Sequence, residues 1–148
     1  MNLNNLTRSI LLLAILTCAT IAQVRQTDER RAFRLPPVLF EDANTHLASG
    51  LAQDAGGLPV LLFDSFYRPI RRGALVSLYG MQMKEGMQVS VIIQVGLISW
   101  EVEADVWKNS FPKIQSVAFR LPVEVTGEVG VTVRHRYQFS NSVRFYVE

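Results

Sequence analysis

The chain has 148 residues, of which 49% are hydrophobic and 19% charged, and its formal net charge at neutral pH is +2. This composition is typical of a globular protein and argues against intrinsic disorder. The basic residues are scattered and nearly balanced by acidic ones, so the charge gives no support for binding nucleic acid or an anionic membrane surface.

Residues 1–22 predict a signal peptide for export from a bacterial cell. Arg8 gives the segment a positive start, an apolar run follows from Ile10 to Leu16, and Thr20-Ile21-Ala22 fits the small-x-small pattern of a cleavage site. We therefore expect cleavage before Gln23 and a secreted or periplasmic product. A retained membrane anchor is the alternative, but the apolar run is shorter than the roughly 20 residues that span a bilayer.

Cys18 is the only cysteine, and it lies inside this segment. A lipid anchor on Cys18 is a further alternative, although Thr17 stands where a lipoprotein signal carries Gly, Ala or Ser. Cleavage before Gln23 would leave a mature chain without cysteine. Neither disulfides nor thiolate metal sites are then expected.

Residues 23–58 predict a polar lead segment or linker. The stretch from Gln23 to Arg34 is rich in charge, and Pro36-Pro37 favours an extended backbone. Residues 44–52 predict at most a short helix, because their apolar positions are sparse and Gly56-Gly57 follows.

Residues 59–148 predict an all-β domain, because short β-type runs alternate there with turn signals. The seven expected strands are Pro59–Phe63, Ala74–Tyr79, Gln88–Val95, Leu97–Trp107, Ile114–Leu121, Gly130–Tyr137 and Val143–Val147. Apolar and polar residues alternate in several of them, as in antiparallel sheets with one face in the core. No long amphipathic helix separates the runs. We therefore expect an antiparallel β-sandwich of about seven strands.

Three stretches of this region have distinctive patterns: a strand that ends in Tyr-Gly, a strand followed by a Leu-Pro step and a glycine-containing turn, and a closing strand that begins with Ser-Asn. They are RGALVSLYGMQM (Arg72–Met83), FPKIQSVAFRLPVEVTGEVGVTV (Phe111–Val133) and SNSVRFYVE (Ser140–Glu148). Together they resemble the immunoglobulin-like IPT/TIG fold, most closely the C-terminal domain of secreted proteins from Acidobacteria such as Solibacter. The resemblance implies an Ig-like binding or spacer module and brings no catalytic or cofactor residues with it.

Glu101, Glu103 and Asp105 are the most distinctive polar residues, because they share one face of an expected strand, about 6.5–7 Å apart in succession. A calcium site needs converging oxygen ligands, and paired-carboxylate hydrolysis needs opposed groups across a cleft. A straight strand provides neither, so a solvated face is the favoured interpretation. The expected cross-strand partners are Arg134, Arg136 or Arg144.

The two histidines, His46 and His135, are isolated in the sequence, and no metal, cofactor or catalytic residue is assigned. One interpretation of the aromatic residues is a carbohydrate platform formed by Trp100, Trp107, Tyr79, Phe111 and Phe145. However, Trp100 and Trp107 are expected on opposite faces of their strand, and core packing is the default for such large rings.

The sequence as a whole predicts an exported, non-catalytic interaction or structural module with a protein or polysaccharide partner. Two alternatives stay open. One is a carbohydrate-binding module for envelope or extracellular polysaccharide, and the other is a small hydrolase that uses the carboxylates of residues 101–105.

Overall fold

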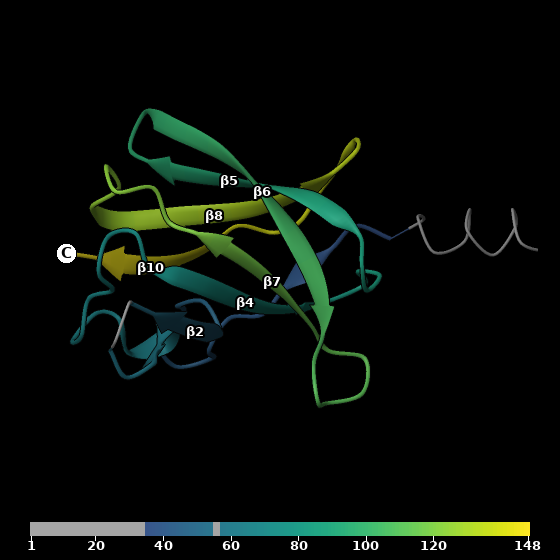
Figure 1. The fold of residues 1–148 in the computed structure, drawn as a ribbon, viewed down its shortest axis with the longest axis horizontal. Coiled ribbons are helices and arrows are strands. Elements are labelled where there is room, and N and C mark those ends of the chain that lie inside the picture. Colours follow the sequence, from purple (N-terminus) through teal and green to yellow (C-terminus); the bar gives the residue numbers. More distant parts are fainter. Residues whose placement is uncertain (1–34, 55–56) are drawn as a thin grey trace, which may run out of the picture. The chain divides into compact units, whose positions relative to one another are not determined.

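The computed structural model of the chain describes residues 35–54 and 57–148, which form an antiparallel all-β sandwich (Figure 1). Residues 36–148 make up one unit. The strands among the described residues are β1 (Val38–Leu39), β2 (Gly50–Gln53), β3 (Val60–Leu61), β4 (Leu75–Met81), β5 (Gln88–Val95), β6 (Ile98–Lys108), β7 (Gln115–Arg120), β8 (Gly127–His135), β9 (Gln138–Phe139) and β10 (Val143–Val147). A 3-10 turn, η1 (Leu62–Asp64), follows β3.

The strands are hydrogen-bonded in the order β10-β8-β5-β6-β7-β4-β2-β3, and the long strand β6 connects the two layers of the sandwich. Residues 98–105 of β6 pair with β5, whereas only residues 105–108 pair with β7. Figure 1 shows β6 crossing from the β5 side of the domain to the β7 side. The sheet therefore turns a corner within one strand.

The core lies between the two layers and is built from alternate residues of each strand. Val91 and Ile93 of β5, Val131 of β8 and Phe145 of β10 are fully buried. Burying each such side chain contributes about 1.5–3 kcal/mol relative to leaving it in water. The predicted alternation of β6 is confirmed at its C-terminal half, where Ala104 and Val106 are buried and Glu103 and Asp105 are exposed.

Residues 36–53, which the sequence assigned to a polar lead segment, contribute β1 and β2 to the sheet. Both strands pair with the same edge of β4. Leu47, Ala48 and Ala52 are buried in consequence. Residues 44–52, for which at most a short helix was expected, form no helix, because the backbone there bonds to distant strands: the Ala48 N–H donates to the Arg144 carbonyl at 2.8 Å.

The strand count of about seven was too low, since the structure adds the short strands β1, β2 and β9. The other predicted strands are confirmed with small shifts at their ends, and the run Pro59–Phe63 is shortened to Val60–Leu61 by the turn η1.

The predicted signal peptide, its cleavage before Gln23 and the alternative lipidation of Cys18 lie outside the described residues. Within residues 35–54 and 57–148, no helix is both long and apolar enough to cross a membrane.

Candidate functional site

An aromatic groove lies along β10, between the hairpin of residues 41–48 and the loop that follows β3. Its volume is about 270 Å³, and its lining residues are Asn44, Thr45, Leu47, Phe63, Phe66, Tyr67, Arg144 and Tyr146. Its lining combines aromatic rings with polar side chains, and pockets that bring the two together are a usual form of ligand site. We refer to these residues as the aromatic groove.

The hairpin on one side of the groove is held by the carboxylate of Asp42. This carboxylate accepts hydrogen bonds from the backbone N–H groups of Asn44 (3.1 Å) and Thr45 (2.9 Å), and from the Thr45 hydroxyl (3.0 Å). The backbone of Asp42 also donates to the Leu47 carbonyl at 2.8 Å. Asp42 therefore fixes the turn that places Asn44 and Thr45 in the groove.

We expect the domain to lose stability at acid pH, because the stabilising effect of this turn depends on the ionised carboxylate of Asp42. The hydrogen bonds from Thr45, its backbone N–H first, lower the pKa of Asp42 below its usual value. A pKa that is lower in the folded state stabilises the fold above the unfolded-state pKa, and this contribution is lost as the pH falls through the folded-state pKa. The free energy of unfolding, measured with urea at pH 7 and pH 3, should therefore fall less between these pH values in Asp42→Asn than in the parent protein.

Glu124→Gln is a matched control for this measurement, because Glu124 is an exposed carboxylate on the β7–β8 loop. If Glu124→Gln reduced the loss of unfolding free energy between pH 7 and pH 3 as much as Asp42→Asn does, the role given to Asp42 would be contradicted.

The loop on the other side of the groove presents three aromatic rings. Its base is pinned by the buried Ser65, whose hydroxyl oxygen accepts a hydrogen bond from the Tyr146 N–H at 3.0 Å. The ring of Phe66 packs edge-to-face on Tyr67 and on Tyr146, with ring centroids 5.2 and 5.4 Å apart. Phe66 and Tyr67 nevertheless remain 61% and 79% exposed. The rings are thus positioned by the fold and still accessible to a ligand.

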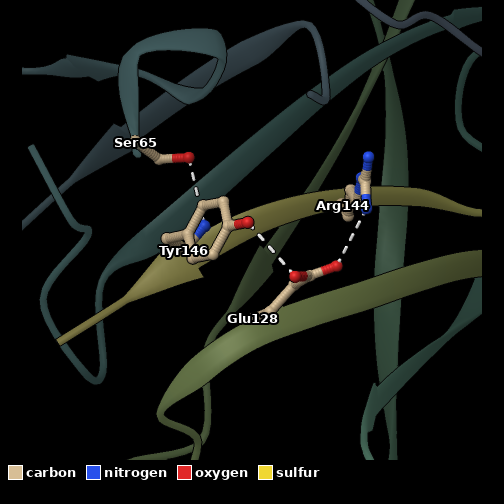
Figure 2. A network of polar contacts seen from close by, with 4 residues as sticks. All are labelled: Ser65, Glu128, Arg144 and Tyr146. Atoms are coloured by element: carbon tan, nitrogen blue, oxygen red, sulfur yellow. Dashed lines mark hydrogen bonds and ion pairs between the residues drawn. The ribbon is translucent and has the colours of Figure 1, made fainter. Parts of the chain in front are cut away.

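Polar contacts fix the floor of the groove (Figure 2). The carboxylate of Glu128 on β8 accepts a hydrogen bond from the Tyr146 hydroxyl and one from the Arg144 guanidinium, both at 3.1 Å. The hydrogen bond to Glu128 is the main reason why the pKa of Tyr146 is raised above its usual value, and desolvation adds to it. Tyr146 is therefore a neutral phenol at physiological pH.

The acidic residues singled out from the sequence lie elsewhere. Glu101, Glu103 and Asp105 are exposed along β6. The predicted cross-strand pairing is confirmed for Arg134, which forms an ion pair with Glu101. Arg144 pairs with Glu128 instead. None of the three carboxylates lines the aromatic groove.

The two histidines are not brought into a metal site. His46 lies in the turn of the 41–48 hairpin, with a φ of 56°, and His135 ends β8. Within residues 35–54 and 57–148, no group of three or more His, Cys, Asp and Glu side chains is arranged to hold a metal ion.

The aromatic residues suggested by the sequence do not form the groove. Phe145 is fully buried and belongs to the core, in agreement with core packing as the default for these rings, and it is not available to a surface platform. Trp100 is half-buried against the core and Trp107 is 58% exposed, as their predicted opposite orientation requires. Phe111 is exposed and Tyr79 half-buried, and neither lines the groove.

The sequence interpretation missed Phe63, Phe66 and Tyr67. A signal was present, because FDSFY places three aromatic residues within a five-residue stretch that ends shortly before Pro69. That stretch has neither helical nor strand periodicity, which indicates a loop. Loops lie on the surface and carry binding residues, so aromatic residues on a loop are candidates for binding.

The described residues therefore belong to an antiparallel β-sandwich that carries an exposed aromatic groove along β10, the strand at one end of the sheet order. Comparison of the chain with protein-family models, with curated proteins and with solved structures gives no match.

Proposed function

We propose that this chain is an exported, non-catalytic binding module with an immunoglobulin-like sandwich of the IPT/TIG kind, and that it acts in the periplasm or at the cell surface. The observation that carries the proposal is the aromatic groove, in which Phe63, Phe66 and Tyr67 stay exposed although ring contacts position Phe66 against Tyr67 and Tyr146. Exposed and clustered apolar rings beside polar groups are characteristic of interaction sites.

The polar groups of the groove favour binding over catalysis. The Arg144 guanidinium and the Tyr146 hydroxyl both bind the Glu128 carboxylate, so their orientation is fixed before a ligand arrives. Such preorganisation reduces the entropy cost of binding. It also leaves these groups engaged with one another, whereas a general acid or base has to be poised toward a substrate.

A glycan is the second candidate for the ligand, and the groove itself favours it. Asn44 and Thr45, which carry an amide and a hydroxyl, line the same groove as Phe66 and Tyr67. Aromatic faces can stack on the apolar faces of sugar rings while amides and hydroxyls bind the sugar hydroxyls. A carbohydrate-binding module would thus use loop residues 63–67 and not the tryptophans of β6.

The proposal predicts site-specific cross-linking at position 67. A photoreactive benzoylphenylalanine in place of Tyr67 should give an adduct in the native cell envelope. The same replacement at Tyr137 is the matched control, because Tyr137 is also an exposed tyrosine but lies in the β8–β9 turn. An adduct that protease digests would indicate a protein ligand, and one that resists protease but reacts as a sugar would indicate a glycan. No adduct at position 67, or equal labelling at 67 and 137, would contradict the proposed function.

A further inference from the structure

One edge of β6 has no neighbouring strand over most of its length among the described residues. The strand pairs with β5 along residues 98–105, but β7 accompanies it only from Asp105. The Val106 N–H donates to the Met87 carbonyl on the β5 side, so even-numbered residues of β6 bond toward β5 and odd-numbered ones toward the other edge. The backbone N–H and C=O groups of Ser99, Glu101 and Glu103 therefore point to an open edge.

The inward face of β6 is incompletely covered at this open edge. Ala104 and Val106 are only 5% and 1% exposed, whereas Trp100 and Val102 in the same row are half-buried. Their partial exposure begins where β7 leaves β6. A further strand at this position would cover Trp100 and Val102, as β7 covers Val106.

The outward face of the same edge is acidic. Glu101 pairs with Arg134, but Glu103 and Asp105 have no ion-pair partner within the described part of the chain. Side chains of an added strand would stand about 4.8 Å from this row, and opposite charges across strands are favourable. Basic side chains on the added strand would therefore complement Glu103 and Asp105.

We infer that the edge of β6 from Ile98 to Ala104 binds an extended peptide strand of a partner protein by β-augmentation. The peptide has Lys or Arg on its outward face and apolar residues on its inward face, where they meet Trp100 and Val102. Main-chain hydrogen bonds supply affinity in this mode, and alternate side chains supply specificity. A second copy of this chain is a poor occupant, because it would bring its own Glu101 and Glu103 against the same acidic row.

Trp100 provides a direct readout of binding. The chain has two tryptophans, so Trp107→Phe leaves Trp100 as the single emitter, and Trp107 is exposed and outside the open edge. A synthetic peptide of alternating Val and Lys should shift the Trp100 emission to shorter wavelength as it covers the ring. A peptide of alternating Val and Glu of the same length is the matched probe and should bind at least about tenfold more weakly.

Two further changes separate backbone pairing from simple charge attraction. A Val/Lys peptide that is N-methylated at every second residue, on the side that faces β6, should lose about tenfold or more in affinity, because it cannot donate to the edge. In the protein, Glu103→Gln removes a charge and should weaken binding roughly threefold. Glu103→Pro removes the outward N–H, which is not used within the sheet, and should abolish binding while the far-UV circular dichroism is retained.

Equal affinity for the Val/Lys and Val/Glu peptides, no binding of the Val/Lys peptide, or no effect of N-methylation would overturn the inference. Concentration-dependent dimerisation that Glu103→Pro abolishes would also overturn it, in favour of a second copy. The N-methylated peptide keeps the test decisive even if Glu103→Pro fails to fold. Phe66→Ala, in the aromatic groove, should leave peptide binding unchanged, so failure of this inference is distinguishable from failure of the proposed function.

Discussion

Replacing Gly50 with alanine is expected to destabilise the domain by about 2–3 kcal/mol. A Cβ atom at residue 50 would lie 2.1 Å from the backbone oxygen of Ser77 and 2.8 Å from Cδ1 of Leu62. Neither neighbour can yield easily, because Ser77 belongs to the central strand β4 and Leu62 is fully buried. The variant must move β2 away from β4, and the adjoining 41–48 hairpin of the aromatic groove should loosen with it.

Urea unfolding measures this loss as a lower midpoint at an unchanged slope. Gly130→Ala is the matched control, since Gly130 also lies in a strand, but the nearest atom to its Cβ would be the Ser142 hydroxyl oxygen at an ordinary 3.6 Å. We expect Gly130→Ala to be neutral or slightly stabilising, because alanine restricts the unfolded chain more than glycine does. Equal losses in the two variants would contradict the close approach of β2 to β4.

The long strands could be predicted from the sequence because their signal is local. Gln88–Val95 and Val143–Val147 have the same bounds in the structure as in the prediction, since alternating apolar residues and flanking turn residues mark them. The alternation along β6 likewise placed Glu101 and Ala104 on opposite faces.

The short strands β1 and β2 could not be predicted in this way. The sequence of β2 is GLAQ, which has no β-branched residue and no clear alternation, and β1 has two residues. Both exist because they pair with β4, a strand well beyond them in the sequence. Such pairing depends on tertiary contacts, which override weak local propensity.

The candidate site could not be predicted from the sequence for the same reason, because it depends on contacts between distant parts of the chain. The aromatic groove joins the loop at Phe66 to Tyr146, and the hydrogen bond that pins this loop links residues that are 81 positions apart. Residue types alone showed that aromatic residues were available on the chain. They did not show that Phe145 points into the core while Tyr146, the next residue, points into the groove.

The opposite orientations of Phe145 and Tyr146 lead to the largest expected effect in the molecule. Phe145 is the largest of the fully buried side chains and lies on β10, opposite Val129 of β8. Phe145→Ala should cost about 3–5 kcal/mol, because it removes the transfer free energy of a whole ring and leaves a cavity between the layers. A domain with a total stability of about 5–15 kcal/mol would be close to unfolding after such a loss.

Phe145→Leu keeps the loss of stability measurable. Its cavity is smaller, so the variant should stay folded and lose less unfolding free energy than Phe145→Ala. Phe111→Ala is the matched control from the same set of aromatic residues: Phe111 is 67% exposed in the β6–β7 loop, and a surface change of this kind should stay within about 0.5 kcal/mol. Urea midpoints in the order parent, Phe111→Ala, Phe145→Leu and Phe145→Ala, from highest to lowest, would agree with a core position for Phe145. Equal midpoints for Phe111→Ala and Phe145→Ala would place both rings on the surface, and the two layers of the sandwich would then lack the ring that fills the space between them.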